Sequence, residues 1–179
     1  MPEILQRRVV GDPILRTKAK QLTKQNITSS DVKAVVENMY YTLKKKQYGI
    51  ALAAPQVGHA LAIAIIDLKP TPTRPNLTAC RMTLFNPKIT EYIGEVVSLR
   101  DGCVSIGAED DPIYGWSERY EGVGVEYQNQ DGDKKVEKFH GFLAHVMQHE
   151  IDHLNGVLFI DRVKDSKTYT TASEYLKQQ

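Results

Sequence analysis

Residues 148–154 read QHEIDHL, and we take this stretch as the centre around which the rest of the chain folds. Apolar residues recur with helical spacing over residues 142–154, and Gly156 follows as a stop signal. His149 and His153 are four residues apart, so their side chains lie one turn apart on the same helix face. Two imidazoles in that arrangement can bind one divalent ion, and Glu150 beside them can reach a water on that ion.

A solvated polar helix is the alternative explanation of this pattern. The apolar neighbours argue against it, because they place the helix in the core, where unpaired His and Glu side chains would be costly. A catalytic ion usually has three protein ligands, so a third must come from elsewhere. The residues alone offer two candidates, Cys103 within the DGCVS segment at 101–105 and Glu174 downstream of the helix.

Hydrophobic periodicity predicts the elements upstream of this helix. Asp12 and Pro13 resemble a helix start. A longer amphipathic helix begins at Ser30 or Asp31 and ends by Gly49, and its apolar face comprises Val32, Val35, Val36, Met39, Tyr40 and Leu43. The β-branched run at residues 61–68 predicts a buried strand, and the three prolines within residues 70–75 predict an extended loop.

The middle of the chain is predicted to be β-structure. Residues 83–89 and 91–99 are expected to form strands, with Asn86-Pro87 breaking the first. Residues 123–127 alternate as a half-buried strand does, residues 129–133 form a turn, and residues 135–139 return as a hairpin partner. Residues 157–160 form a short strand or a segment that docks on the core, and the polar tail ends in a short helix. We therefore predict one α+β domain over residues 1–179, with antiparallel strands packed around the central helix and an amphipathic helix near the N terminus.

Composition excludes several classes of protein. The chain has 179 residues, 41% hydrophobic and 25% charged, which suits one soluble domain. A net charge of +1 provides no field to recruit nucleic acid or an acidic membrane, and no apolar run reaches membrane-spanning length. Two cysteines are too few for a disulfide scaffold, so we expect Cys80 to be a buried free thiol.

Three segments together resemble the peptide deformylase family. They are GIALAAPQVG at residues 49–58, DGCVS at 101–105 and QHEIDHL at 148–154, in the family's order and spacing. The resemblance implies a hydrolase that removes the formyl group from the N-terminal formyl-methionine of nascent polypeptides and releases formate. It implies that Cys103, His149 and His153 hold one divalent ion. Iron is the metal that the resemblance favours, with Zn²⁺, Ni²⁺ or Co²⁺ as substitutes.

The resemblance also implies the catalytic roles. Glu150 would take a proton from water and return it to the leaving amine. The side-chain amide of Gln56 and the backbone N–H of Val104 would stabilise the oxyanion of the tetrahedral intermediate. Other positions would contact the substrate. Ile50, Ala51 and Gly102 would pair with its backbone as an added strand. Leu99, His145 and Val146 would line the methionine pocket, and Arg119 would meet the peptide downstream of the methionine.

Four positions depart from the family pattern. Ala51 stands where glycine is usual, which narrows the backbone groove, and Asp101 stands where glutamate is usual. Val104 replaces a common leucine. His145 replaces an apolar residue, and we expect it to wall the pocket or support the ligands rather than bind the ion. These changes spare the ligands, so they concern substrate fit more than chemistry.

Three other functions remain open at this stage. They are an endopeptidase with Glu174 as third ligand, a cysteine hydrolase with Cys103 as nucleophile, and a protein that binds peptide ends without hydrolysing them. Formylated N termini are the expected partners, whereas the tail lacks the basic stripe that would support docking on the ribosome. A cytoplasmic location is expected, and the sequence does not separate a bacterial origin from an organelle or phage one.

Overall fold

An antiparallel sheet frames the molecule in a computed structural model that describes residues 1–46, 49–71 and 75–177. Within these residues the strands are β1 Ala51–Ala53, β2 Ile63–Leu68, β3 Cys80–Gly107, β4 Pro112–Gln128, β5 Lys134–His140 and β6 Thr170–Thr171. The first five pair in chain order, and β6 pairs with β4. From β1 to β5, consecutive strands are therefore neighbours, and β1 and β5 are the two ends of this ordered path.

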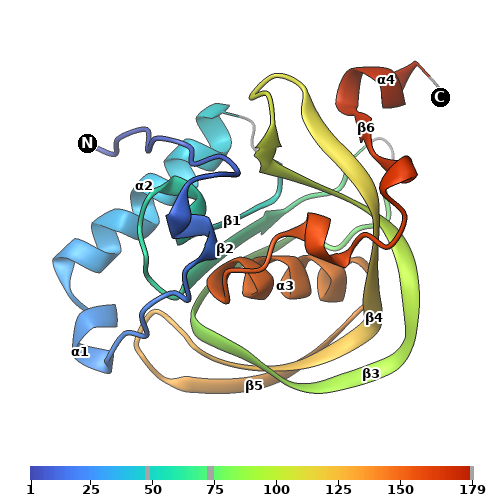
Figure 1. Cartoon of the computed structure of the whole chain (residues 1–179). Helices are drawn as coiled ribbons and strands as arrows, with labels where there is room; N and C mark the ends of the chain where they lie inside the picture. Colours follow the sequence, from blue (N-terminus) through green and yellow to red (C-terminus); the bar gives the residue numbers. More distant parts are fainter. Residues whose placement is uncertain (47–48, 72–74, 178–179) are drawn as a thin grey trace.

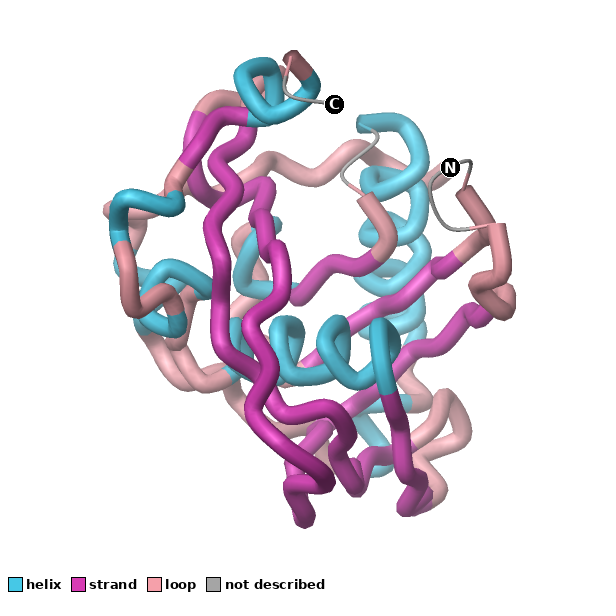
Figure 2. Tube along the Cα trace, turned by 90° about the vertical axis from the view of Figure 1, so that its right-hand side faces the viewer, coloured by secondary structure: helices cyan, strands magenta, loops and turns pink. Residues whose placement is uncertain are grey.

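A central helix lies inside the curve of this sheet. The α-helices are α1 Lys24–Ile27, α2 Ser30–Lys46, α3 Gly141–Leu154 and α4 Ala172–Leu176, with 3-10 turns η1 Pro13–Arg16, η2 Ala54–Val57, η3 Phe159–Arg162 and η4 Ser166–Thr168. Figures 1 and 2 show α3 enclosed by the curving strands, with α2 lying beside β1 and β2. Every residue of α3 from 144 to 154 is buried. This enclosure confirms the predicted central position of the helix.

The predicted amphipathic helix is present as α2. Its buried residues include Val32, Val36, Met39 and Leu43, which belong to the predicted apolar face. They pack in one cluster with Ile63 and Ile65 of β2 and with Phe85 of β3. Because residues at i, i+4 and i+7 share a helix face, this spacing is sufficient to bury one side of α2 against the sheet.

The predicted break at Asn86-Pro87 is wrong. The strand β3 runs without interruption from Cys80 to Gly107, and the pairing with β4 shifts register between Phe85 and Lys88. Asn86 takes a positive φ of 52°, and its side-chain amide donates to Leu22 O and to Gln128 Oε1. Asparagine tolerates this left-handed conformation, so the chain forms a bulge and continues.

The structure confirms some of the remaining predicted segments and not others. The turn at 129–133 and its hairpin partner are confirmed by β5, which pairs with β4. Residues 157–160 form no strand and instead lead into η3, with Leu158 and Phe159 buried, so the docking alternative holds. Of the predicted loop at 70–75, residues 72–74 lie outside the described residues. The short helix expected in the tail is α4.

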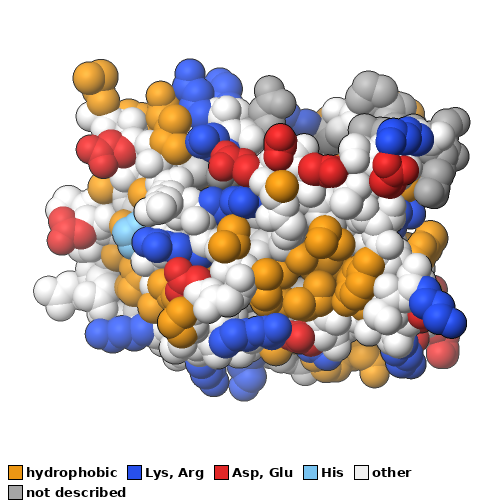
Figure 3. All heavy atoms as spheres, turned by 45° about the horizontal axis from the view of Figure 1, so that its top comes forward, with side chains coloured by type: hydrophobic (Ala, Val, Ile, Leu, Met, Phe, Trp, Pro, Cys, Tyr) orange, Lys and Arg blue, Asp and Glu red, His pale blue; other side chains and the backbone are white. Residues whose placement is uncertain are grey.

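The surface carries charges of both signs. On the face shown in Figure 3, acidic and basic side chains are interspersed around a group of hydrophobic ones. None of the described helices combines the length and apolar character that crossing a membrane requires.

Candidate active site

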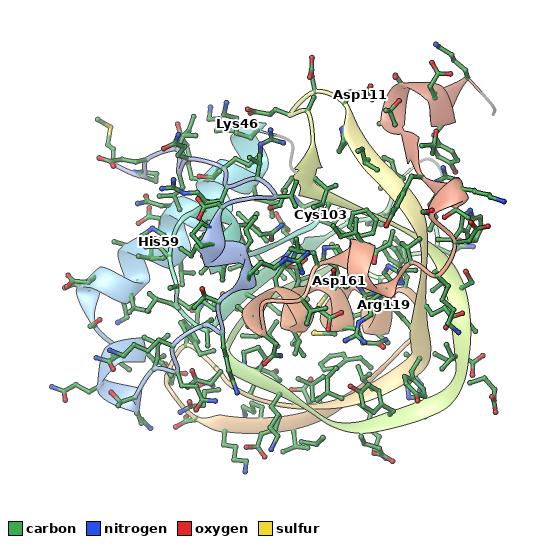
Figure 4. The ribbon with its side chains drawn as sticks, in the orientation of Figure 1. Lys46, His59, Cys103, Asp111, Arg119 and Asp161 are labelled. Carbon is green, nitrogen blue, oxygen red and sulfur yellow. The ribbon has the colours of Figure 1, made fainter. Side chains whose placement is uncertain are left out.

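Three buried donor atoms from two elements lie together: Cys103 Sγ of β3 and the Nε2 atoms of His149 and His153 of α3 (Figure 4 labels Cys103). Cys103 Sγ is 3.2 Å from His153 Nε2, and the two Nε2 atoms are also 3.2 Å apart. The donors of a tetrahedral ion bound at about 2.0–2.3 Å stand roughly 3.3–3.8 Å from one another. These thiolate and imidazole donors therefore fit one transition-metal ion.

The backbone around Cys103 explains how a strand residue reaches the helix. Gly102 pairs with Tyr114, and a Cβ at Gly102 would lie 2.3 Å from the Tyr114 ring. No larger residue fits this approach without a shift. The pairing of β3 with β4 then shifts register between Gly102 and Gly107. Such an irregularity re-aims the side chains that it contains, and Cys103 is one of them.

Asp101 contacts the imidazole of His149 at Nδ1, the ring nitrogen that is not part of the donor cluster. Its Oδ1 lies 2.8 Å from His149 Nδ1. Its Oδ2 accepts hydrogen bonds from Ser117 Oγ at 2.9 Å and from Arg119 Nη2 at 2.9 Å. A carboxylate on the far ring nitrogen fixes the orientation of an imidazole, so that Nε2 of His149 is left free to bind an ion if one is present.

The pKa values of the two imidazoles are shifted in opposite directions. Burial by itself would lower the pKa of His149, but the adjacent Asp101 raises that pKa well above its usual value. Burial, reinforced by the charge of His149, lowers the pKa of His153 well below its usual value. Burial would raise the pKa of Asp101, yet His149 and Arg119 hold it well below its usual range. A cation that binds His149 would therefore compete with a proton for its ring nitrogen.

Arg119 does not lie where a peptide-binding arginine would. Only 3% of its surface is exposed, and its guanidinium donates to Asp101 and, through Nη1, to Asp152 Oδ2 at 2.9 Å. Asp152 in turn accepts from Arg162 Nη2 at 2.8 Å. A buried guanidinium requires such partners, and here two carboxylates already accept its hydrogen bonds. The sequence analysis did not predict this chain of ion pairs. The signal that could have indicated it was Asp152, an acidic residue inside a helix expected to be buried.

A cavity lies beside this chain of ion pairs and not at Cys103. Its volume is about 300 Å³, and its lining includes Tyr92, Tyr120 and Arg162. None of the three donor residues lines it. The chemistry of the donor cluster, and not the size of this cavity, therefore locates the candidate site.

Glu150 is buried next to the first imidazole. It is 4% exposed, and its Oε2 has no hydrogen-bond partner among the described residues. Burial raises its pKa to about 7, although the charge of His149 acts in the opposite direction. A carboxyl group poised near neutrality can both accept and return a proton.

Gln56 reaches the site from η2, where it is 2% exposed. The Ala53 N–H donates to its Oε1 at 2.8 Å, which requires the oxygen to face that N–H. Its NH₂ group consequently faces the site and donates to Cys103 Sγ at 3.2 Å and to Ser105 Oγ at 3.4 Å. The side-chain amide is thus held as a donor directed at Cys103 and Ser105 of β3.

Two of the expected strand-binding positions lie at the edge strand. Ala51 begins β1, which pairs with β2 on one side and ends the ordered path of the sheet. Ile50 precedes it, and its carbonyl accepts from Asp67 N at 2.7 Å. An edge strand has a side on which an extended peptide can add. Gly102, the third such position, lies on β3 next to Cys103.

The pocket positions lie at different depths. His145 and Val146, both on α3, are 4% exposed, whereas Leu99 of β3 is half-buried. His145 Nε2 stands 3.4 Å from Asp101 Oδ1 and is outside the donor cluster. Glu174, the alternative ligand, lies on α4 with its side chain 57% exposed and paired with Lys177. The structure therefore does not bring Glu174 to the histidines.

Comparisons with known proteins agree on one family. The model of the family described as polypeptide deformylase matches residues 4–169. A peptide deformylase of Dictyoglomus turgidum is 38% identical over 165 residues, covering 92% of this chain and 96% of that protein. Peptide deformylase 2 of Nostoc sp. is 33% identical over 175 residues, covering 97% and 94%.

Solved structures give the same result. The class I type b peptide deformylase of Acinetobacter baumannii, determined with bound Met-Ala-Ser, has a TM-score of 0.83 and 31% identity, covering 91% of this chain and 100% of that one. The peptide deformylase of Thermotoga maritima has a TM-score of 0.77 and 35% identity, covering 91% and 99%. With the family model matching most of its length, the chain belongs to the polypeptide deformylase family.

Proposed function

We propose that this chain hydrolyses the formyl group from the N-terminal formyl-methionine of nascent polypeptides, with formate as the released product, and that residues 1–179 act as one catalytic domain. The observation that carries the proposal is the buried cluster of Cys103, His149 and His153 with Glu150 beside it. Family membership supplies the reaction, and the cluster supplies the groups that the reaction needs. A bacterial cytoplasm is the setting we infer for it.

The three donors would hold one divalent ion, and we propose iron as the native metal. When bound, such an ion acts as a Lewis acid that activates water and polarises the formyl carbonyl. Asp101 keeps His149 oriented for this task through the 2.8 Å contact at Nδ1. The donor set also suits zinc, nickel or cobalt, which we expect to substitute for iron.

Glu150 is proposed to move the proton. With a pKa of about 7 caused by burial, its carboxyl group can accept a proton from water and deliver it to the departing amine. The charge of a bound ion would favour the carboxylate and bring the pKa back toward its usual value. Its place on α3 puts it next to His149 in the chain.

The oxyanion is proposed to be stabilised by the side-chain amide of Gln56 and the backbone N–H of Val104. The amide is supported because Ala53 fixes its orientation and its NH₂ group faces Cys103. Donors that are already aimed need no reorganisation as charge develops, and removing one typically raises the barrier by about 2.7–4 kcal/mol.

The peptide is proposed to bind as a strand added to β1. Ile50, Ala51 and Gly102 would pair with its backbone, and Leu99, His145 and Val146 would line the methionine pocket. Support comes from the position of β1 at the end of the sheet and from the related enzyme of Acinetobacter baumannii, which was determined with bound Met-Ala-Ser. We leave Arg119 out of this proposal, because two carboxylates already accept hydrogen bonds from its guanidinium.

Formate release from a formyl-Met-Ala-Ser peptide tests the proposal. The protein is purified without oxygen and loaded with iron or nickel, and Glu150→Ala is compared with Glu174→Ala, a carboxylate removed far from the cluster. We expect release by the wild type and by Glu174→Ala, and none by Glu150→Ala. Metal-loaded wild type that releases no formate would indicate a peptide-binding protein. Activity that survives chelation would indicate Cys103 as a nucleophile paired with His153.

A further inference from the structure

An N-terminal strap contacts both η2 and β3, the two elements that carry Gln56 and Cys103. We define the strap as residues 7–10, which lie in the dark blue segment of Figure 1. The Arg8 N–H donates to Gln56 O at 2.8 Å, and the Val10 N–H donates to Ser105 O at 2.9 Å. One short segment therefore contacts both η2 and the part of β3 that follows Cys103.

The side chain of Arg7 adds a contact where the sheet pairing is irregular. Its Nη1 donates to Val104 O at 2.6 Å and lies 3.4 Å from Gly107 O. Both carbonyls fall within the register shift of β3 that contains Cys103. A guanidinium donates hydrogen bonds that are stronger than those between neutral groups, so Arg7 restrains this stretch of backbone.

The Val104 carbonyl is linked to the sulfur of Cys103 through a single peptide group. That carbonyl and the Ser105 N–H belong to one peptide group, and the Ser105 N–H donates to Cys103 Sγ at 3.4 Å. A hydrogen bond at one end of a peptide group polarises the other end, which strengthens the second bond. The contacts therefore run from the Arg7 guanidinium through one rigid peptide to the thiolate.

We propose that Arg7 is a positioning residue for the irregular stretch of β3 that carries Cys103, acting on Cys103 through the Val104–Ser105 peptide. This inference rests on the proposed function of Cys103 as a ligand and extends it to a residue 97 positions away from Val104 in the chain. The guanidinium fixes the plane of the peptide, directs the Ser105 N–H at the sulfur and so sets how strongly the thiolate donates to an ion. Arg7 touches neither ion nor substrate.

Arg7→Ala and Arg7→Lys are compared with Arg8→Ala as the matched control. The Arg8 guanidinium faces Asp12, with Nη1 3.7 Å from Oδ2, so its loss removes a charge from the strap and keeps the backbone contact to Gln56. The first readout is amide hydrogen exchange over residues 103–107 in the metal-free protein. The second is the thiolate-to-cobalt absorption band of the cobalt-loaded protein. The third is kcat and KM for formate release.

Arg7→Ala should speed exchange over residues 103–107 about tenfold, shift the cobalt band and lower kcat about tenfold, with KM little changed. Arg7→Lys should recover part of each effect, because it keeps one charged donor, and Arg8→Ala should match the wild type. Unchanged exchange and an unchanged band in Arg7→Ala would overturn the proposal whether or not the protein is a deformylase. Wild type without activity, combined with faster exchange in Arg7→Ala, would overturn the proposed function and leave the positioning role standing.

Discussion

Replacing Glu150 with Gln in the metal-free protein measures how strongly burial penalises this carboxylate. Glu150 is 4% exposed, and burial raises its pKa from the usual 4.5 to about 7. Such a shift disfavours the ionised form in the folded state by about 3 kcal/mol. The folded chain therefore holds this proton to higher pH than the unfolded chain does. The stability that the protonated form contributes is complete below about pH 4.5 and is lost as the pH rises through about 7.

The assay is urea unfolding of the metal-free proteins at several pH values between 5 and 8, with free energies from linear extrapolation. Glutamine stays neutral throughout. Between pH 5 and pH 8, the free energy of unfolding of Glu150→Gln should therefore rise by about 2–3 kcal/mol relative to that of the wild type. The titrations of His149 and His153 occur in both proteins and largely cancel. Adding metal should shrink the gap, because its charge favours the carboxylate. Unfolding free energies that change in parallel with pH would refute the raised pKa of Glu150 and the penalty that burial places on its carboxylate.

Three further predictions concern the ligand, the ion pair and the groove. Cys103→Ser should remove most of the bound metal, measured by elemental analysis after dialysis, whereas Glu174→Ala should retain it; the reverse result would restore Glu174 as the third ligand. Asp101→Asn should lower the free energy of unfolding by about 3 kcal/mol in denaturant titrations, because Arg119 remains buried with one carboxylate fewer. A loss below about 1 kcal/mol would show that water or Asn compensates. Ala51→Gly should raise kcat/KM for formyl-Met-Ala-Ser about threefold by widening the backbone groove, and an unchanged or lower value would contradict this.

Local patterns determined much of the secondary structure. The spacing of Val32, Val36, Met39 and Leu43 predicted α2, and the pair His149 and His153 placed two imidazoles on one face of α3. Such predictions succeed because a helical period relates residues only three or four positions apart, which the sequence displays directly. The resemblance of three motifs to one family then selected Cys103, a choice that the residues alone had left open against Glu174.

Tertiary structure decided what depends on residues distant in sequence. Only the fold shows that Asp101 and Asp152 enclose Arg119, which moves this arginine from an expected peptide contact to a buried ion pair. Only the fold brings Arg7 to the Val104 carbonyl. Whether a side chain is exposed, paired or directed at a ligand depends on which strands become neighbours and where their register shifts. No local period encodes these properties, because they arise from the packing of the whole chain.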